Sequence, residues 1–160
     1  MPPKITARRV SRELALQILY QCELTQHTVP EVLEHFPIWE ETKDSVKTFA
    51  LQLTEGVLSH RAELDQRLAA TAEKWSVDRM APVDRNILRL GAYELLFCPD
   101  TPSRVVINEA IELAKKFSTS QSGRFVNGLL DALSKQNDTA DKDDKADKDD
   151  RNDKEKIKNE

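Results

Sequence analysis

The sequence predicts an all-α fold, a single bundle of about seven helices arranged in two halves. Apolar residues recur every three to four positions along most of the chain, and no segment shows the sustained alternation of a half-buried strand. Only four glycines occur among the 160 residues. A chain of this length is sufficient for one domain with a sizeable core.

The first half of the bundle is expected to contain four helices. A long helix spans 6–25, and a short one begins at Pro30, a favourable residue for a helix start, and ends at Pro37. A third helix begins near Thr42, and a fourth follows Ser59.

The second half begins after a connector that ends at Pro82. This proline starts the most apolar helix, whose apolar residues point in nearly every direction, as in a central helix. Two prolines make 98–102 a turn. The next helix covers 109–117 with Asn108 as its cap, unless 105–107 are also helical, and the last covers 124–134 with Ser122 as its cap.

The charge of the chain is concentrated in its last segment. The net charge is −4, and residues 137–160 contain Asp/Lys near-repeats with Ile157 as the one apolar residue besides alanine. Such a segment buries too little apolar surface to offset the entropy of ordering it. The folded domain is therefore expected to span 6–136, followed by a disordered tail. This tail is interpreted as a solubilising extension without a specific role. The less favoured alternative is that its charged residues compete weakly with RNA for the basic residues near the N-terminus.

Several classes of protein are excluded by what the sequence lacks. No apolar run approaches 18 residues and no apolar segment follows the charged N-terminus, so we expect a soluble, cytoplasmic protein without membrane contact. Cys22 and Cys98 lack CxxC spacing and are interpreted as small core residues. No nucleotide-binding, hydrolase or metal-ligand motif occurs, so no enzyme, cofactor or metal is expected. Glu94 lies on an apolar helix face, where a structural buried pair is favoured over catalysis.

The N-terminus, residues 1–12, forms a basic arm that runs into the first helix. Lys4, Arg8, Arg9 and Arg12 precede the first acidic residue, Glu13. Cations at a helix start are unfavourable because the macrodipole is positive there. That cost favours a functional role over a merely solvated arm, and these four residues are predicted to contact RNA phosphates.

The first helix is apolar on two opposite sides when 100° per residue is applied. One side carries Leu14, Ile18 and Cys22, and the other carries Leu16, Tyr20 and Leu24. A helix of this kind is either buried on both sides or keeps one for a partner. The second group is therefore a candidate protein-binding face, with packing inside the bundle as the alternative.

Further candidates lie around the turn between the last two helices. Lys116 and Arg124 either extend the basic surface or act as ordinary helix-end cations. Phe125 is either an edge residue of the core or a platform for an RNA base. The amide of Asn127 either recognises RNA or bonds locally, and Gly128 is predicted to allow close helix packing.

Three separated blocks carry a family resemblance. Residues 105–117 read VVINEAIELAKKF and are followed by RFVNGLLD at 124–131. Residues 87–95 read ILRLGAYEL, and 8–20 contain RR followed by ALQILY. These blocks resemble the NusB family of bacterial transcription antitermination factors over about residues 6–135. The acidic tail has no counterpart in that pattern.

The resemblance implies an all-helical monomer or homodimer that binds the boxA element of nascent rRNA transcripts as a heterodimer with NusE. NusE is the small-subunit ribosomal protein that doubles as a transcription factor, and the complex helps RNA polymerase pass terminators. The resemblance places the NusE contact at Tyr20 and Leu24, with Asp84 nearby. The alternative function is a helical adaptor that binds proteins and never RNA, and the basic arm is the feature that favours RNA.

Overall fold

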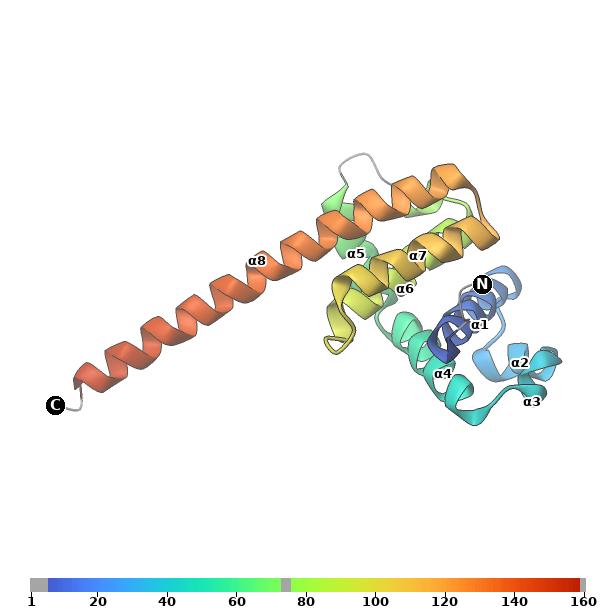
Figure 1. Cartoon of the computed structure of the whole chain (residues 1–160), viewed down its shortest axis with the longest axis horizontal. Helices are drawn as coiled ribbons and strands as arrows, with labels where there is room; N and C mark the ends of the chain where they lie inside the picture. Colours follow the sequence, from blue (N-terminus) through green and yellow to red (C-terminus); the bar gives the residue numbers. More distant parts are fainter. Residues whose placement is uncertain (1–5, 73–75, 159–160) are drawn as a thin grey trace.

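The computed structural model describes residues 6–72 and 76–158, which form helices and no strand (Figure 1). The all-α prediction is therefore confirmed for this part of the chain. In order, the helices are α1 (Ala7–Thr25), α2 (Val29–Glu34), α3 (Ile38–Glu41), α4 (Asp44–Ser59), α5 (Arg61–Thr71), α6 (Pro82–Phe97), α7 (Ser103–Phe117) and α8 (Ser120–Lys158), with a 3₁₀ turn at Val77–Arg79 before α6.

The helix α1 is buried on both of its apolar sides for most of its length. Thr6 caps its start by accepting a hydrogen bond from the backbone N–H of Arg9, and Gln26 ends it in the left-handed conformation with φ 60°. One side packs in a smaller cluster formed by Leu14, Ile18, Val32, Phe36, Trp39, Val46 and Ala50. The other side, with Ala15, Leu16 and Leu19, packs in the main core with α4 and α6.

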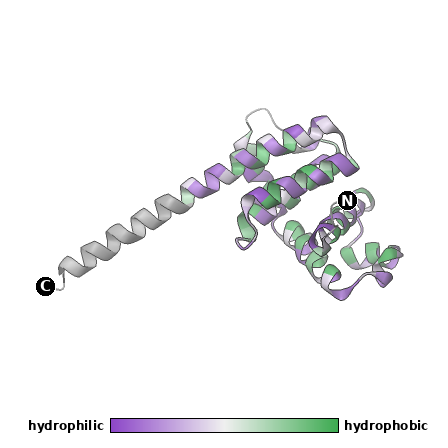
Figure 2. Cartoon of the chain, in the orientation of Figure 1, coloured by the Kyte–Doolittle hydropathy of each residue, from purple (hydrophilic) through white to green (hydrophobic). Residues whose placement is uncertain are grey.

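The helix α6 is the central helix, as its sequence predicts. All of its residues from Asn86 to Glu94 are buried, and it contacts α1, α4, α5, α7 and α8. A Cβ atom at Gly91 would lie 2.5 Å from Leu130 Cδ1, so glycine allows α8 to approach closely here. Figure 2 shows hydrophobic residues on the sides of the helices that face one another.

The helices α7 and α8 begin earlier than their predicted caps. The helix α7 starts at Ser103, directly after Pro102, so Asn108 lies inside it and the longer version of this helix is confirmed. Thr119 caps α8, since its Oγ1 accepts a hydrogen bond from the backbone N–H of Ser122 at 3.1 Å. The prediction that Ser122 caps the helix is wrong because Thr119 supplies the same acceptor one turn earlier.

The described part of the predicted tail, residues 137–158, differs most from its prediction. Disorder is expected there, whereas α8 continues as one helix to Lys158 and leaves the bundle (Figure 1). No glycine or proline follows Gly128, and Asp and Lys recur four residues apart, a spacing that supports a helix. The packed first part of α8 supplies the helix nucleus, so each further residue adds a hydrogen bond without the nucleation cost.

Deleting 137–160 is expected to leave the thermal midpoint of unfolding nearly unchanged. None of residues 135–140 is buried, whereas Leu133 and Ser134 are, and α8 projects away from the bundle (Figure 1), so we expect the deletion to remove little packed surface. Thermal melts of the full and shortened chains check this. A large drop in the midpoint would show that the extension packs on the bundle, and deletion from Leu129 onward is the destabilising control.

Candidate nucleic-acid interface

The three arginines at the start of α1 lie in three different environments. Arg12 is only 5% exposed, and its Nε and Nη2 donate to Glu94 Oε2 and Oε1 at 2.9 and 2.8 Å. The expected buried pair at Glu94 is confirmed, and its partner is Arg12. The prediction that Arg12 contacts RNA is wrong, because its guanidinium is enclosed between α1 and α6.

Two other predicted RNA contacts tie α1 to α7. Arg9 donates from Nε and Nη2 to Glu109 at 3.1 and 3.0 Å, and the Lys116 ammonium donates to Glu13 at 2.9 Å. The hydrogen bond to Glu109, together with its charge, raises the pKa of Arg9 above its ordinary value. Both cations keep solvent-accessible surface, so they combine helix docking with a place on the basic surface.

Arg8 is exposed, and within the described part of the chain it has no acidic partner. Its guanidinium carbon lies 3.8 Å from the centre of the Phe49 ring. Stacking of this kind holds the side chain in place without neutralising its charge. Arg8 is therefore the arginine of α1 that is best placed to meet a phosphate, while Lys4 lies outside the described residues.

The start of α8 presents the second group of predicted RNA contacts to solvent. Arg124, Phe125 and Asn127 are all exposed, and Phe125 keeps 41% of its surface. The core interpretation of Phe125 is therefore wrong, and its ring is available for stacking. Asn127 lines a surface pocket with Asn108 and Arg104 of α7.

Gly128 is exposed, and a Cβ atom there would meet nothing within 4 Å. The prediction that it allows close helix packing is therefore wrong. Gly128→Ala is expected to stabilise the free protein by about 0.5–1 kcal/mol, because glycine inside a helix costs that much relative to alanine. Urea melts check this, with Gly91→Ala as the control that should destabilise. A loss of stability in Gly128→Ala would show a packing role that the structure lacks.

The candidate protein-binding face is smaller than the sequence predicts. Leu16 is 2% exposed in the main core, so its assignment to this face is wrong. Tyr20 is half-buried and Leu24 is 56% exposed, so the face survives only at the end of α1. Asp84 accepts hydrogen bonds from the Ser118 and Ser122 hydroxyls at 2.7 and 3.1 Å, which commits its carboxylate to the turn between α7 and α8.

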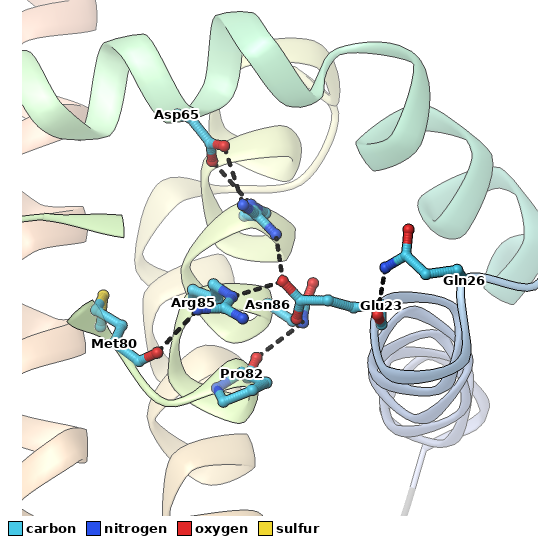
Figure 3. A network of polar contacts seen from close by, with 8 residues as sticks. Glu23, Gln26, Asp65, Met80, Pro82, Arg85 and Asn86 are labelled. Carbon is cyan, nitrogen blue, oxygen red and sulfur yellow. Dashed lines mark hydrogen bonds and ion pairs between the residues drawn. The ribbon is translucent and has the colours of Figure 1, made fainter. Parts of the chain in front are cut away.

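A network of ion pairs and hydrogen bonds next to Leu24 was missed from the sequence (Figure 3). The Glu23 carboxylate accepts from Arg85 Nε at 2.6 Å and from the Asn86 amide at 3.0 Å, and Arg89 Nη1 lies 3.7 Å from it. Arg89 also donates from Nε and Nη2 to Asp65 at 2.8 and 2.9 Å. The network joins α1, α5 and α6, and the one signal for it was a charged residue, Arg89, within an apolar helix.

The described residues give little support for a metal site, a membrane-spanning helix or a reactive cysteine. They contain no group of His, Cys, Asp or Glu side chains arranged to hold a metal ion. None of their helices is long and apolar enough to cross a membrane. Cys22 and Cys98 are partly buried against the two clusters, as expected of core residues, and burial raises the pKa of both thiols, which keeps them protonated at neutral pH.

Comparison with known proteins identifies the family. The model of the NusB family matches residues 9–135. The chain belongs to the NusB family. The NusB transcription antitermination protein of Myxococcus xanthus is 48% identical over 134 residues, covering 80% of this chain and 94% of the relative. That of Thermodesulfovibrio yellowstonii is 42% identical over 139 residues, covering 81% and 92%.

Solved NusB structures share the fold. A structure of T. maritima NusB is 38% identical with a TM-score of 0.74, covering 83% of this chain and 93% of that chain. A complex of the antitermination factors NusB and NusE with dsRNA contains a chain 28% identical with a TM-score of 0.74, covering 83% and 99%. The NusB match ends one residue beyond the buried Ser134, so the extended part of α8 lies outside the region shared with the family.

Proposed function

We propose that this chain is a transcription antitermination factor that binds the boxA element of nascent rRNA transcripts together with the ribosomal protein NusE. The observation that carries the proposal is its likeness, along most of its length, to the NusB chain solved with NusE and RNA. Its curated relatives are transcription antitermination proteins, which supports the same role.

The proposed RNA surface runs over α7, the start of α1 and the start of α8. Arg8 lies near the start of α7, where it lines a groove with Val105, and α8 packs along α7 with Arg124 and Phe125 exposed. The arginines, with Arg9 and Lys116 between them, would meet phosphates, whereas Phe125 and Asn127 would meet bases.

The proposed NusE surface is the exposed end of α1. Leu24 and Tyr20 supply apolar and aromatic contact area, which is typical of binding hot spots. The carboxylate of Glu23, which precedes Leu24 in the sequence, is bound by Arg85, Asn86 and Arg89 of α6, so this end of α1 is fixed before NusE binds. Asp84 positions the turn between α7 and α8 in this scheme and does not itself contact NusE.

As a member of the RNA polymerase antitermination complex, the chain would work in the cytoplasm as a binding factor and not as an enzyme. The alternative is a protein-only adaptor that binds NusE and leaves RNA untouched. The exposure of Arg8, Arg124 and Phe125 favours RNA contact, because neither arginine has an acidic partner among the described residues and an adaptor has no use for free cations beside an exposed ring.

Titration of labelled boxA RNA with the chain, with and without NusE, tests the proposal. We expect NusE to tighten RNA binding, and Arg124→Ala to reduce the log–log salt slope by about 0.7 per lost phosphate contact. Arg79→Ala, an exposed arginine in the 3₁₀ turn, is the matched control. Binding of NusE without any binding of RNA would establish the adaptor instead.

The same titration tests the NusE surface. Leu24→Ala is expected to weaken NusE binding on the order of tenfold, since an exposed anchor is removed. Its unfolding free energy should change by no more than about 0.5 kcal/mol. Ile38→Ala is the matched control, because Ile38 is an equally exposed apolar residue, at 55%, and belongs to a different helix, α3. Equal NusE affinity for both variants would exclude this face, and sedimentation without NusE reports whether two copies associate.

A further inference from the structure

A groove of about 710 Å³ lies between the start of α1 and the turn that joins α6 to α7. The residues that matter in its lining are Arg8, Phe49, Phe97, Asp100 and Val105. Its volume falls within the range of about 300–1,000 Å³ that is typical of small-molecule sites. It is separate from the exposed face of α8 that carries Phe125.

The walls of this groove expose apolar surface that the fold leaves uncovered. Phe97 is 37% exposed and Val105 is 42% exposed, and they are two of the six large apolar residues that the structure describes as exposed. Phe97 is held from behind, since its ring stacks on Tyr93 at 5.4 Å and lies 4.2 Å from the His60 ring. A fixed aromatic ring with one open side is a platform on which another flat ring can stack.

The charges around the groove leave one free cation within the described residues. Glu94 and Glu109 are neutralised by Arg12 and Arg9. Arg8 remains unpaired, with its guanidinium stacked over Phe49. An arginine plane beside an aromatic wall suits a nucleotide, because it can meet a phosphate while the ring meets the base.

The exposed Asp100 is the carboxylate of the groove that no cation neutralises in the described part of the chain. It would repel a phosphate, but a carboxylate accepts hydrogen bonds from the amino groups of bases. This places the phosphate at the Arg8 end and the base edge at the turn. The bases of a duplex are stacked and paired, so only unpaired nucleotides offer both features.

We propose that this groove binds one or two unpaired nucleotides of the RNA, with a base stacked on Phe97 and a phosphate at Arg8. The inference rests on the proposed function, because it adds a single-stranded subsite to the same RNA interface. It adds a base contact at Phe97 to the phosphate contact at Arg8, and it does not include Phe125, because the groove is lined by residues of α1, α4, α6 and α7.

The test uses the full chain with NusE and a set of boxA RNAs that carry 2-aminopurine at successive positions. Stacking quenches 2-aminopurine, so we expect quenching at one or two positions with the unchanged protein and its loss with Phe97→Ala. RNA affinity should fall about 5- to 150-fold in Phe97→Ala, as for one lost base–aromatic stack. The salt slope should stay the same, whereas Arg8→Ala should reduce it.

A second variant, Val105→Glu, tests the groove in case Phe97→Ala does not fold. Val105→Glu adds an acidic residue to the first turn of α7, which has none, and a negative charge is favourable at a helix start. It should keep the thermal midpoint and weaken RNA binding by placing a negative charge in the groove. Ile38→Glu is its control and should leave RNA binding unchanged.

The outcomes separate the two proposals. RNA binding that is unaffected by Phe97→Ala and Val105→Glu, without position-specific quenching, overturns the groove and leaves the proposed function standing. Weakened NusE binding with unchanged RNA binding would make the groove a protein surface and also overturn the inference. Failure of the unchanged chain to bind boxA RNA with NusE would remove the proposed function and the groove together.

Discussion

Arg12→Ala is expected to lower the unfolding free energy by about 3–5 kcal/mol, the usual effect of removing one partner of a buried ion pair. The Glu94 carboxylate would stay in the core without the two hydrogen bonds that Arg12 donates at 2.9 and 2.8 Å. The pair joins α1 to α6, so its loss loosens the contact between the first helix and the central one.

Urea denaturation of Arg12→Ala and Arg8→Ala measures this effect against a matched control. Arg8 lies one turn earlier on the same helix and is exposed, so its change should stay within about 0.5 kcal/mol. The double variant Arg12→Met with Glu94→Leu should recover most of the loss, because apolar residues of similar size replace both charges. Unchanged stability in Arg12→Ala, with a reduced RNA salt slope, would restore Arg12 as an RNA contact.

Arg89→Ala is expected to cost a similar amount, about 3–5 kcal/mol, because Arg89 is buried and serves two carboxylates. Asp65 on α5 loses a bidentate partner, and Glu23 on α1 loses a nearby positive charge. The lost contacts should loosen three helices, since the network of Figure 3 joins α1, α5 and α6.

Urea melts compared with Arg61→Ala check this second prediction. Arg61 lines the same small cavity as Arg89 but is exposed, so its removal should have little effect. Hydrogen exchange adds a local measure: the amides at the end of α1 and along α5 should exchange faster in Arg89→Ala. If both variants melted alike, the network would contribute nothing net and its two carboxylates would be adequately solvated.

The sequence predicted the helices well because their signals are local. Pro82 and Thr6 mark helix starts through backbone geometry and capping, which depend on a few adjacent residues. Apolar periodicity likewise identified α6 as central. The extension of α8 was missed because disorder was inferred from the lack of burial, whereas a helix that is already nucleated needs no burial to continue one residue at a time.

The candidate site was harder to predict because it depends on which helices meet. At 100° per residue, Arg12 lies only 40° from Leu16 around α1, on the side that α6 covers. The residues next to Arg12 and Glu94 in the sequence give no sign that these two side chains meet. Leu16 and Leu24 share a face but lie two turns apart, and the bundle covers only the first. Partners distant in sequence therefore decide which cations and apolar residues remain free.

The extension of α8 beyond the bundle changes how the molecule moves through water. Residues 137–158 in helical form add a rod of about 33 Å at 1.5 Å per residue (Figure 1). A protein with such a projection has a larger Stokes radius than a sphere of equal mass, so it leaves a gel-filtration column early. A monomer can thus elute at a volume expected of a compact dimer. Light scattering, which reports mass independently of shape, is therefore the appropriate gauge of self-association for this chain.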